Sequence, residues 1–137
     1  MLLSMDLSTH GIVALVRDGD GKFLLLEDSR EPMKGCWAPP HGRCELTDAS
    51  EEEGVIREVR EETGLAVLPV RRVLTQPADT KIKTVSFWVV IGESSDPKLN
   101  EESVSFGWFS VDEALSLELY PGTRVFFEKV KSGEVEL

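Results

Sequence analysis

The sequence predicts an α/β sandwich with a mixed β-sheet, formed as a single domain over residues 1–137. The chain has 137 residues, 41% of them hydrophobic, which suits one compact core and argues against disorder. Short runs of β-branched and aromatic residues alternate with segments that begin with helix-capping signals. No internal repeat, low-complexity segment or Pro/Gly/Ser-rich linker divides the chain. Strands interspersed with helices are typical of α/β folds.

The first part of the chain is predicted to form a β-hairpin followed by a loop. Residues 12–16 and 23–26 are short apolar runs, and the Asp-Gly-Asp-Gly sequence at 18–21 between them favours a tight turn. Residues 30–35 contain a proline and a glycine and are predicted to form a loop. Residues 37–42 contain two prolines, which keep them extended or turned.

A helix over residues 51–63 is the clearest local prediction. Ser50 and Glu53 have the spacing of a capping box, in which the serine hydroxyl accepts from the backbone N–H of Glu53 and the glutamate reaches back. Gly64 supplies the left-handed residue that ends a helix. The apolar positions of this segment form one stripe: Val55, Ile56 and Val59.

The second half is predicted to contain three strands, at residues 67–74, 83–91 and 106–109, and two helices. The sequence Ser-Val-Asp-Glu at 110–113 is a second capping box and opens a short helix to about residue 117. Pro121 and Gly122 are expected to break the chain, after which Thr123 caps a last helix that ends near Gly133.

Composition excludes several classes of function. The formal net charge of −10 disfavours binding to nucleic acid or to an anionic membrane surface, because both need a basic face. No apolar run approaches the roughly 20 residues of a membrane span. Residues 1–7 lack the basic flank of a secretory signal, so we expect a cytoplasmic protein. The two cysteines are expected to be free thiols rather than zinc ligands.

The acid excess is concentrated around the predicted helix. Residues 45–62 carry eight of the 25 acidic side chains and two of the 15 basic ones. Glu58, Glu61 and Glu62 fall within an arc of roughly 100° that borders the apolar stripe. A hard cation such as Mg²⁺ would neutralise such a cluster, and Arg57 could orient one carboxylate. The alternative is a solvated helix face with surface ion pairs.

Residues 57–65, Arg-Glu-Val-Arg-Glu-Glu-Thr-Gly-Leu, closely resemble the second half of the Nudix box. All seven specified positions of that half match. The first half departs from the signature, because the gap after Gly42 ends at Asp48 rather than at a glutamate, and eight residues instead of seven precede Arg57. We interpret this as a one-residue insertion before the helix. The resemblance implies the α/β/α sandwich of Nudix hydrolases, with a mixed sheet.

The resemblance extends beyond the box. Residues 37–42 are similar to the family's aromatic-x-x-Pro-Gly-Gly approach, with His41 in place of the first glycine, whose carbonyl binds metal in MutT-like members. A loop glutamate lies six residues before a tryptophan in those members, which is Glu102 here, with Glu101 as the runner-up. The implied metal ligands are the carboxylates and the carbonyl of five residues: Glu58, Glu61, Glu62, Glu102 and His41.

The implied activity is Mg²⁺-dependent hydrolysis of the pyrophosphate linkage in a nucleoside diphosphate joined to a group X, with Mn²⁺ as a substitute. Arg57, Glu58 and Glu61 are the implied catalytic residues, with Glu58 as the general base and Glu102 as the alternative base. A catalytically inactive Nudix nucleotide-binding or sensor domain is the competing interpretation; such proteins often lose a box glutamate, and none is lost here. Many members dimerise, so a homodimer is one expected state.

The partner is expected to be a small nucleotide whose group X the sequence leaves open. Trp37, Phe87 and Trp88 are candidates for stacking a base, and Arg30 and Arg43 are among the basic residues that could contact phosphate. The competing interpretations are that these aromatic residues belong to the core and that the basic residues are solvated. Markers of the dinucleoside polyphosphate, ADP-ribose and oxidised-guanine subfamilies are not found at their usual spacing.

Overall fold

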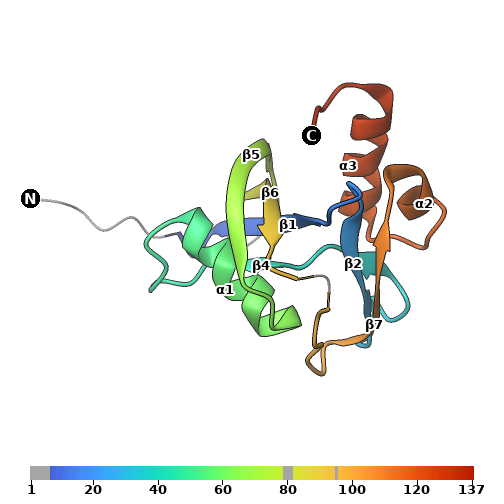
Figure 1. Ribbon diagram of the computed structural model, residues 1–137. Helices are drawn as coiled ribbons and strands as arrows, with labels where there is room; N and C mark the ends of the chain where they lie inside the picture. Colours follow the sequence, from blue (N-terminus) through green and yellow to red (C-terminus); the bar gives the residue numbers. More distant parts are fainter. Residues whose placement is uncertain (1–6, 79–81, 95) are drawn as a thin grey trace, which may run out of the picture.

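The computed structural model describes residues 7–78, 82–94 and 96–137, and within them it forms an α/β/α sandwich (Figure 1). Helix α1 covers one face of a mixed sheet, while α2 and α3 lie on the other side, which confirms the predicted fold class. The strands are β1 (His10–Arg17), β2 (Phe23–Asp28), β3 (Trp37–Ala38), β4 (His41–Arg43), β5 (Val67–Pro77), β6 (Thr84–Gly92) and β7 (Ser103–Phe109). The helices are α1 (Glu51–Thr63), α2 (Val111–Leu115) and α3 (Pro121–Ser132).

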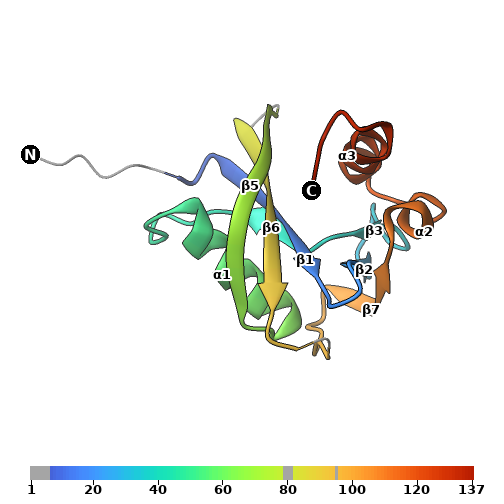
Figure 2. The ribbon, with the colours of Figure 1, turned by 45° about the horizontal axis from the view of Figure 1, so that its top comes forward.

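The sheet has the order β3-β2-β1-β6-β5, with β4 also paired to β1 and β7 to β2. Strands β1 and β6 are parallel from His10 opposite Thr84 to Arg17 opposite Ile91, and the other pairings between the named strands are antiparallel. Figure 2 shows β5, β6 and β1 side by side across the face of α1. The predicted hairpin joins β1 to β2, and its turn uses the left-handed conformation of Gly21.

The alternation of side chains along the strands divides the core in two. Trp88 and Val90 of β6 pack toward α1, whereas Phe87 and Val89 pack toward α3. Phe87 stacks on Phe126 of α3 with ring centroids 4.2 Å apart. Because apolar residues fill both faces, the strands are held rigidly enough to position side chains at their ends.

Helix α1 has the predicted limits, and its capping differs in one bond. Ser50 Oγ accepts from the backbone N–H of Glu53, as expected, but the Glu53 carboxylate accepts from the backbone N–H of Ala49 rather than of Ser50. Gly64 ends the helix with φ of 71°. The capping box predicted for α2 is complete. In the described ranges, no helix is both long and apolar enough to cross a membrane.

The start of α3 differs from the prediction. The helix begins at Pro121, and Thr123 lies inside its first turn instead of capping it. Proline is favoured at the first helical position, because its φ is already helical and its missing N–H needs no partner there. The strands are also longer than the sequence ranges or displaced from them: β1 and β2 extend beyond both apolar runs, β5 runs to Pro77, β6 to Gly92, and β7 starts at Ser103. Residues 1–6, part of the segment considered for a signal, lie outside the described residues.

Candidate metal-binding and catalytic site

The last turns of α1 carry three carboxylates that differ in their exposure to solvent. Glu62 is 7% exposed, the side chain of Glu58 is 14% exposed, and that of Glu61 is 53% exposed. The helical spacing places them on one side of α1, as the sequence predicts. The structure therefore confirms partial desolvation for Glu58 and Glu62 but not for Glu61.

Glu58 and Glu62 form a strained electrostatic pair. Burial, and then the neighbouring charge of Glu58, raise the pKa of Glu62 to about 9. Burial also raises the pKa of Glu58, although its contact with Arg57 opposes that shift. Among the buried side-chain oxygens and nitrogens of the described residues, only Glu62 Oε2 has no hydrogen-bond partner. Such a pair favours keeping one proton, and a bound cation would favour the ionised form of both carboxylates.

Arg57 holds Glu58 in place through a network of ion pairs. Its Nε and Nη2 donate to the two carboxylate oxygens of Asp48 at 3.1 and 2.9 Å. Its Nη1 donates to Glu58 at 3.1 Å and to Glu61 at 3.3 Å, and Nη2 also donates to the carbonyl of Arg43. The hydrogen bond from Arg57 outweighs burial and lowers the pKa of Asp48. Asp48, whose role the interrupted first half of the box left open, thus anchors the arginine.

Strand β4 passes directly over the carboxylates. The backbone N–H of His41 donates to Glu62, and the His41 ring lies edge-on to Tyr120 with centroids 5.1 Å apart. At Gly42 a Cβ would lie 2.3 Å from Cδ of Glu58 and 2.4 and 2.5 Å from its two oxygens. The Glu58 carboxylate therefore occupies space that only glycine at position 42 leaves free.

Glu102 approaches the same site from the loop before β7. Its negative charge contributes to the raised pKa of Glu62, so the two carboxylates are electrostatic neighbours. Its Oε1 accepts from Arg30 at 2.8 Å and its Oε2 accepts from Asn100 at 3.2 Å. Glu101, the alternative to Glu102, makes a main-chain contact: its carbonyl accepts a hydrogen bond from the Ser29 hydroxyl.

The donor set fits a hard divalent cation, although the side chains are not yet gathered around one point. No group of three His, Cys, Asp or Glu in the described part of the chain has an arrangement ready to hold a metal ion. Glu61 and Glu102 instead bind the arginines Arg57 and Arg30. The unpartnered buried oxygen of Glu62 and the oxygen-only donors nevertheless match the ligand preference of Mg²⁺.

Tyr120 lines two cavities, and Glu62 lines the smaller of them. The smaller one is bounded by Glu62, His41, Asp28 and Arg30. The other has a volume of about 160 Å³ and is mostly apolar. It is lined by Val13, Ala38, Pro39, His41, Gln76, Val85, Phe87, Tyr120, Gly122 and Thr123.

Three of the residues considered for substrate binding lie elsewhere. Trp88 is buried, and its indole N–H donates to Glu51 at the opposite end of α1 from Glu62. Trp37 packs edge-on against Phe109 with ring centroids 5.4 Å apart. Arg43 is exposed and contributes its carbonyl to Arg57. None of the three residues lines either cavity beside Glu62.

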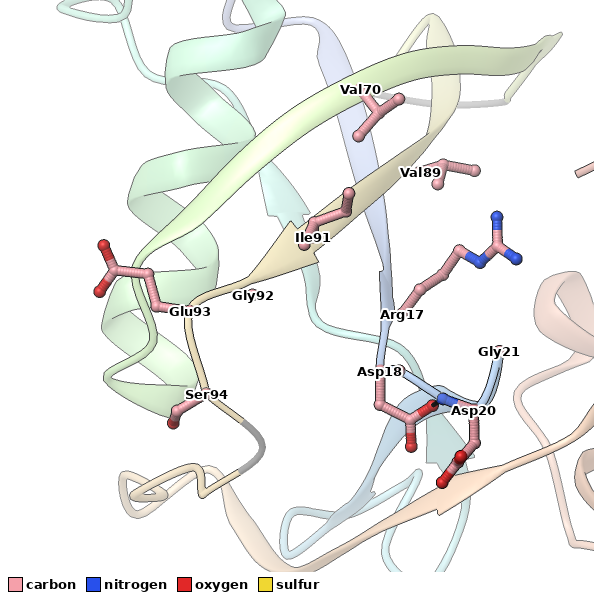
Figure 3. A pocket seen from close by; sticks show the side chains of 11 residues that line it. Arg17, Asp18, Asp20, Gly21, Val70, Val89, Ile91, Gly92, Glu93 and Ser94 are labelled. Atoms are coloured by element: carbon pink, nitrogen blue, oxygen red, sulfur yellow. Dashed lines mark hydrogen bonds between the residues drawn. The ribbon is translucent and has the colours of Figure 1, made fainter.

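A further cavity, of about 630 Å³, is lined by residues other than the four glutamates of the site (Figure 3). Val70, Val89 and Ile91 form its apolar part, and Arg17 and Asp18 come from the end of β1 and the turn after it. None of its lining residues is among the catalytic, metal-binding or substrate-binding residues that the sequence predicts. Both cysteines are free, and burial raises the pKa of the Cys44 thiol to about 11.

Several contacts of the site were not predicted from the sequence. Asp28, Arg30 and Tyr120 meet although up to 92 residues separate them, and Asn100 joins the group through Glu102. No local spacing signals such a contact, because the pairing of β2 with β7 and the path of the chain before α3 bring them together.

Comparisons with known proteins identify the family of the chain. The sequence matches the family model of the NUDIX domain over residues 8–130. It is 43% identical over 58 residues to an ADP-ribose pyrophosphatase of Methanocaldococcus jannaschii, covering 41% of this chain and 34% of that protein. The chain thus matches about a third of the length of this relative.

Two crystal structures have the same fold over most of the chain. A MutT protein from Methanosarcina mazei Go1 has a TM-score of 0.73 and 33% identity, covering 91% of this chain and 94% of that one. An ADP-ribose pyrophosphatase from Streptococcus suis has a TM-score of 0.70 and 25% identity, covering 93% of each chain. The family match, the shared fold and the intact second half of the box together show that this chain belongs to the NUDIX domain family.

Proposed function

We propose that this chain hydrolyses the pyrophosphate linkage of a nucleoside diphosphate joined to a group X, with Mg²⁺ as its metal and Mn²⁺ as a substitute. The observation that carries the proposal is the buried, unpartnered oxygen of Glu62 beside Glu58, which calls for a cation at the end of α1. ADP-ribose is the first candidate substrate, because two similar proteins bear the name ADP-ribose pyrophosphatase. Nucleoside triphosphates are the second candidate.

Five groups would hold the metal: the carboxylates of Glu58, Glu61, Glu62 and Glu102, and the carbonyl of His41. When bound, the metal would neutralise the charge of the pyrophosphate, which otherwise repels an attacking nucleophile. The net charge of −10 makes a small nucleotide arriving with metal a better partner than a nucleic acid. That the whole chain forms a single domain, and that two copies form a homodimer, are further predictions.

The side chains of this protein would supply the proton transfer. A water oxygen forms a bond to phosphorus, the bridging P–O bond breaks, and the bridging oxygen leaves with the second phosphate. Glu58 is the proposed base that accepts the water proton, and Glu102 is the alternative. Arg57, 3.1 Å from Glu58 and anchored by Asp48, would fix the direction of that carboxylate.

The mostly apolar cavity beside Tyr120 is the proposed place for the organic part of the substrate. This cavity has a volume of about 160 Å³, and it shares Ala38, Pro39, His41 and Tyr120 with the smaller cavity, of about 10 Å³, that Glu62 lines. Phe87 and Tyr120 offer aromatic surface there, and Gln76 offers an amide for hydrogen bonding. Trp37, Arg43 and Trp88 are not part of this proposal.

The test is a substrate panel of ADP-ribose, nucleoside triphosphates and dinucleoside polyphosphates, with Mg²⁺, with Mn²⁺ or with EDTA. Released phosphate is measured with and without a phosphomonoesterase, since cleavage of a nucleoside diphosphate-X yields phosphomonoesters. We expect metal-dependent release from at least one class of substrate. Metal binding without any turnover would overturn the proposal in favour of the sensor interpretation, and the absence of metal binding would overturn both.

A further inference from the structure

Asp28, at the end of β2, uses both of its carboxylate oxygens to bind two partners from distant parts of the chain. Oδ1 accepts from the backbone N–H of Arg30 at 2.8 Å and from its Nε at 3.2 Å. Oδ2 accepts from the hydroxyl of Tyr120. Burial by itself raises the pKa of Asp28, but these partners outweigh burial and lower it, so the carboxylate remains charged. Asp28 is 7% exposed, which makes it a fixed point between β2 and the start of α3.

The Arg30 side chain extends from this fixed point to Glu102. Its Nε binds Asp28 while its Nη1 donates to Glu102 Oε1 at 2.8 Å. On the other side of Glu102, Asn100 Nδ2 donates to Oε2 and also to the carbonyl of Glu61 at the end of α1. Each carboxylate oxygen has two lone pairs, so these bonds leave one on each oxygen for a further partner.

The loop that carries Glu102 is also bound through its main chain to the residue that follows β2. The backbone N–H of Ser29 donates to the carbonyl of Glu102 at 3.0 Å, and the Ser29 hydroxyl donates to the carbonyl of Glu101. The loop is therefore attached to the end of β2 independently of Arg30. Since the Arg30 side chain is 56% exposed, its ion pair with Glu102 contributes little to stability. The contact can instead determine the position of the Glu102 carboxylate.

We propose that Asp28 and Tyr120 fix the guanidinium of Arg30, and that Arg30 acts as a positioning residue that sets the place of the Glu102 carboxylate relative to Glu62. This inference rests on the proposed function, because it gives Glu102 its role beside the carboxylates of α1. The hydroxyl of Tyr120 acts only through Asp28 and Arg30, and it needs no contact with the metal or the reacting phosphorus.

The first test is the affinity for Mn²⁺ without substrate, measured by the electron paramagnetic resonance of free Mn²⁺. Tyr120→Phe keeps the ring and removes the hydroxyl, and Arg30→Gln removes the contact to Glu102. Loss of a group that orients a metal ligand typically weakens affinity, so we expect Kd for Mn²⁺ to rise by about tenfold in both variants. Arg30→Lys, which keeps the positive charge on a single nitrogen, should recover part of the loss.

Two matched controls separate positioning from general damage. Ser105→Ala removes another hydroxyl that binds a carboxylate between β2 and β7, where Ser105 donates to Glu27 at 2.7 Å. Arg71→Gln removes an arginine charge from the exposed strand β5. Both controls should leave the Kd for Mn²⁺ unchanged, and thermal melts should be similar for all variants.

The outcomes distinguish this inference from the proposed function. Unchanged or tighter Mn²⁺ binding in Tyr120→Phe and Arg30→Gln would overturn the positioning role, even if the wild type turns over ADP-ribose. Weaker Mn²⁺ binding in both variants would support that role even if no substrate in the panel is cleaved. If the wild type has turnover, we expect kcat to fall in both variants while KM changes less than twofold.

Discussion

Arg57 and Asp48 form a two-point ion pair, with Nε 3.1 Å from Oδ1 and Nη2 2.9 Å from Oδ2. The pair joins the loop before α1 to the helix itself, and the remaining nitrogen of the guanidinium reaches Glu58. Both partners are largely buried, with side-chain exposures of 20% and 7%. The direction of the Glu58 carboxylate thus depends on an aspartate nine positions before the arginine.

Replacing Asp48 tests this dependence. Asp48→Asn removes the charge and at least one acceptor, so Arg57 is left partly unpaired and we expect the free energy of unfolding to fall by about 1–3 kcal/mol. Turnover should fall with it, because Glu58 loses its fixed direction. Glu45→Gln is the matched control, since Glu45 is an exposed partner of the same arginine at 3.3 Å. Urea unfolding and the rate of substrate cleavage measure both effects; equal changes in the two variants would contradict the anchoring role of Asp48.

Replacing either carboxylate of the buried pair should separate activity from stability. Glu58→Gln and Glu62→Gln are each expected to lower metal-dependent turnover by at least about 10²-fold. In EDTA neither variant should melt below the wild type, because burial disfavours the charged form of both carboxylates and the amide carries no charge. Mg²⁺ should raise the melting temperature of the wild type more than that of either variant. Glu52→Gln, on an exposed position of α1, is the control, and near-wild-type turnover in both site variants would refute the assignment.

Gly42→Ala should displace the Glu58 carboxylate directly. A Cβ at this position would lie within 2.5 Å of three atoms of that group, so the carboxylate must move. We expect turnover to be largely lost while the circular dichroism spectrum stays that of the wild type. Gly19→Ala, where no atom lies within 4 Å of an added Cβ, controls for the substitution itself. Full activity in Gly42→Ala would show that Glu58 needs no defined position.

Glu51, the first residue of α1, should make stability depend on acid pH. Burial raises its pKa, but hydrogen bonds from His10, Trp88 and Ser86 outweigh burial and lower the pKa below the ordinary value of 4.5. The unfolded chain therefore binds protons in a range where the folded chain does not, and the free energy of unfolding falls as the pH drops below 4.5.

Glu51→Gln should flatten this dependence between about pH 5 and pH 3, because the substituted residue no longer titrates. Urea unfolding followed by tryptophan fluorescence measures it, since Trp88 donates to Glu51 at 3.1 Å. Glu52 is the exposed neighbour of Glu51, so Glu52→Gln is the control variant. Its free energy of unfolding should depend on pH as that of the wild type does. Parallel curves for the wild type and Glu51→Gln would rule out this source of pH dependence.

The sequence alone predicted features that depend on neighbours a few residues apart. The limits of α1 follow from Ser50 and Gly64, and the placement of Glu58 and Glu62 at the edge of the core follows from helical periodicity. Such features are set by local backbone geometry, and a short stretch of sequence contains all the atoms involved. The family, too, was predicted from the second half of the box and is confirmed by the family match.

Tertiary structure decided which partners those side chains meet. Asp48 binds Arg57, Tyr120 reaches Asp28 across 92 positions, and α3 starts at Pro121 rather than at Thr123. These contacts arise from strand pairing and from the packing of α3 on the sheet, and neither has a local spacing that a sequence pattern could reveal. The sequence by itself determined the carboxylates of α1, while the folded chain determined the groups that hold them.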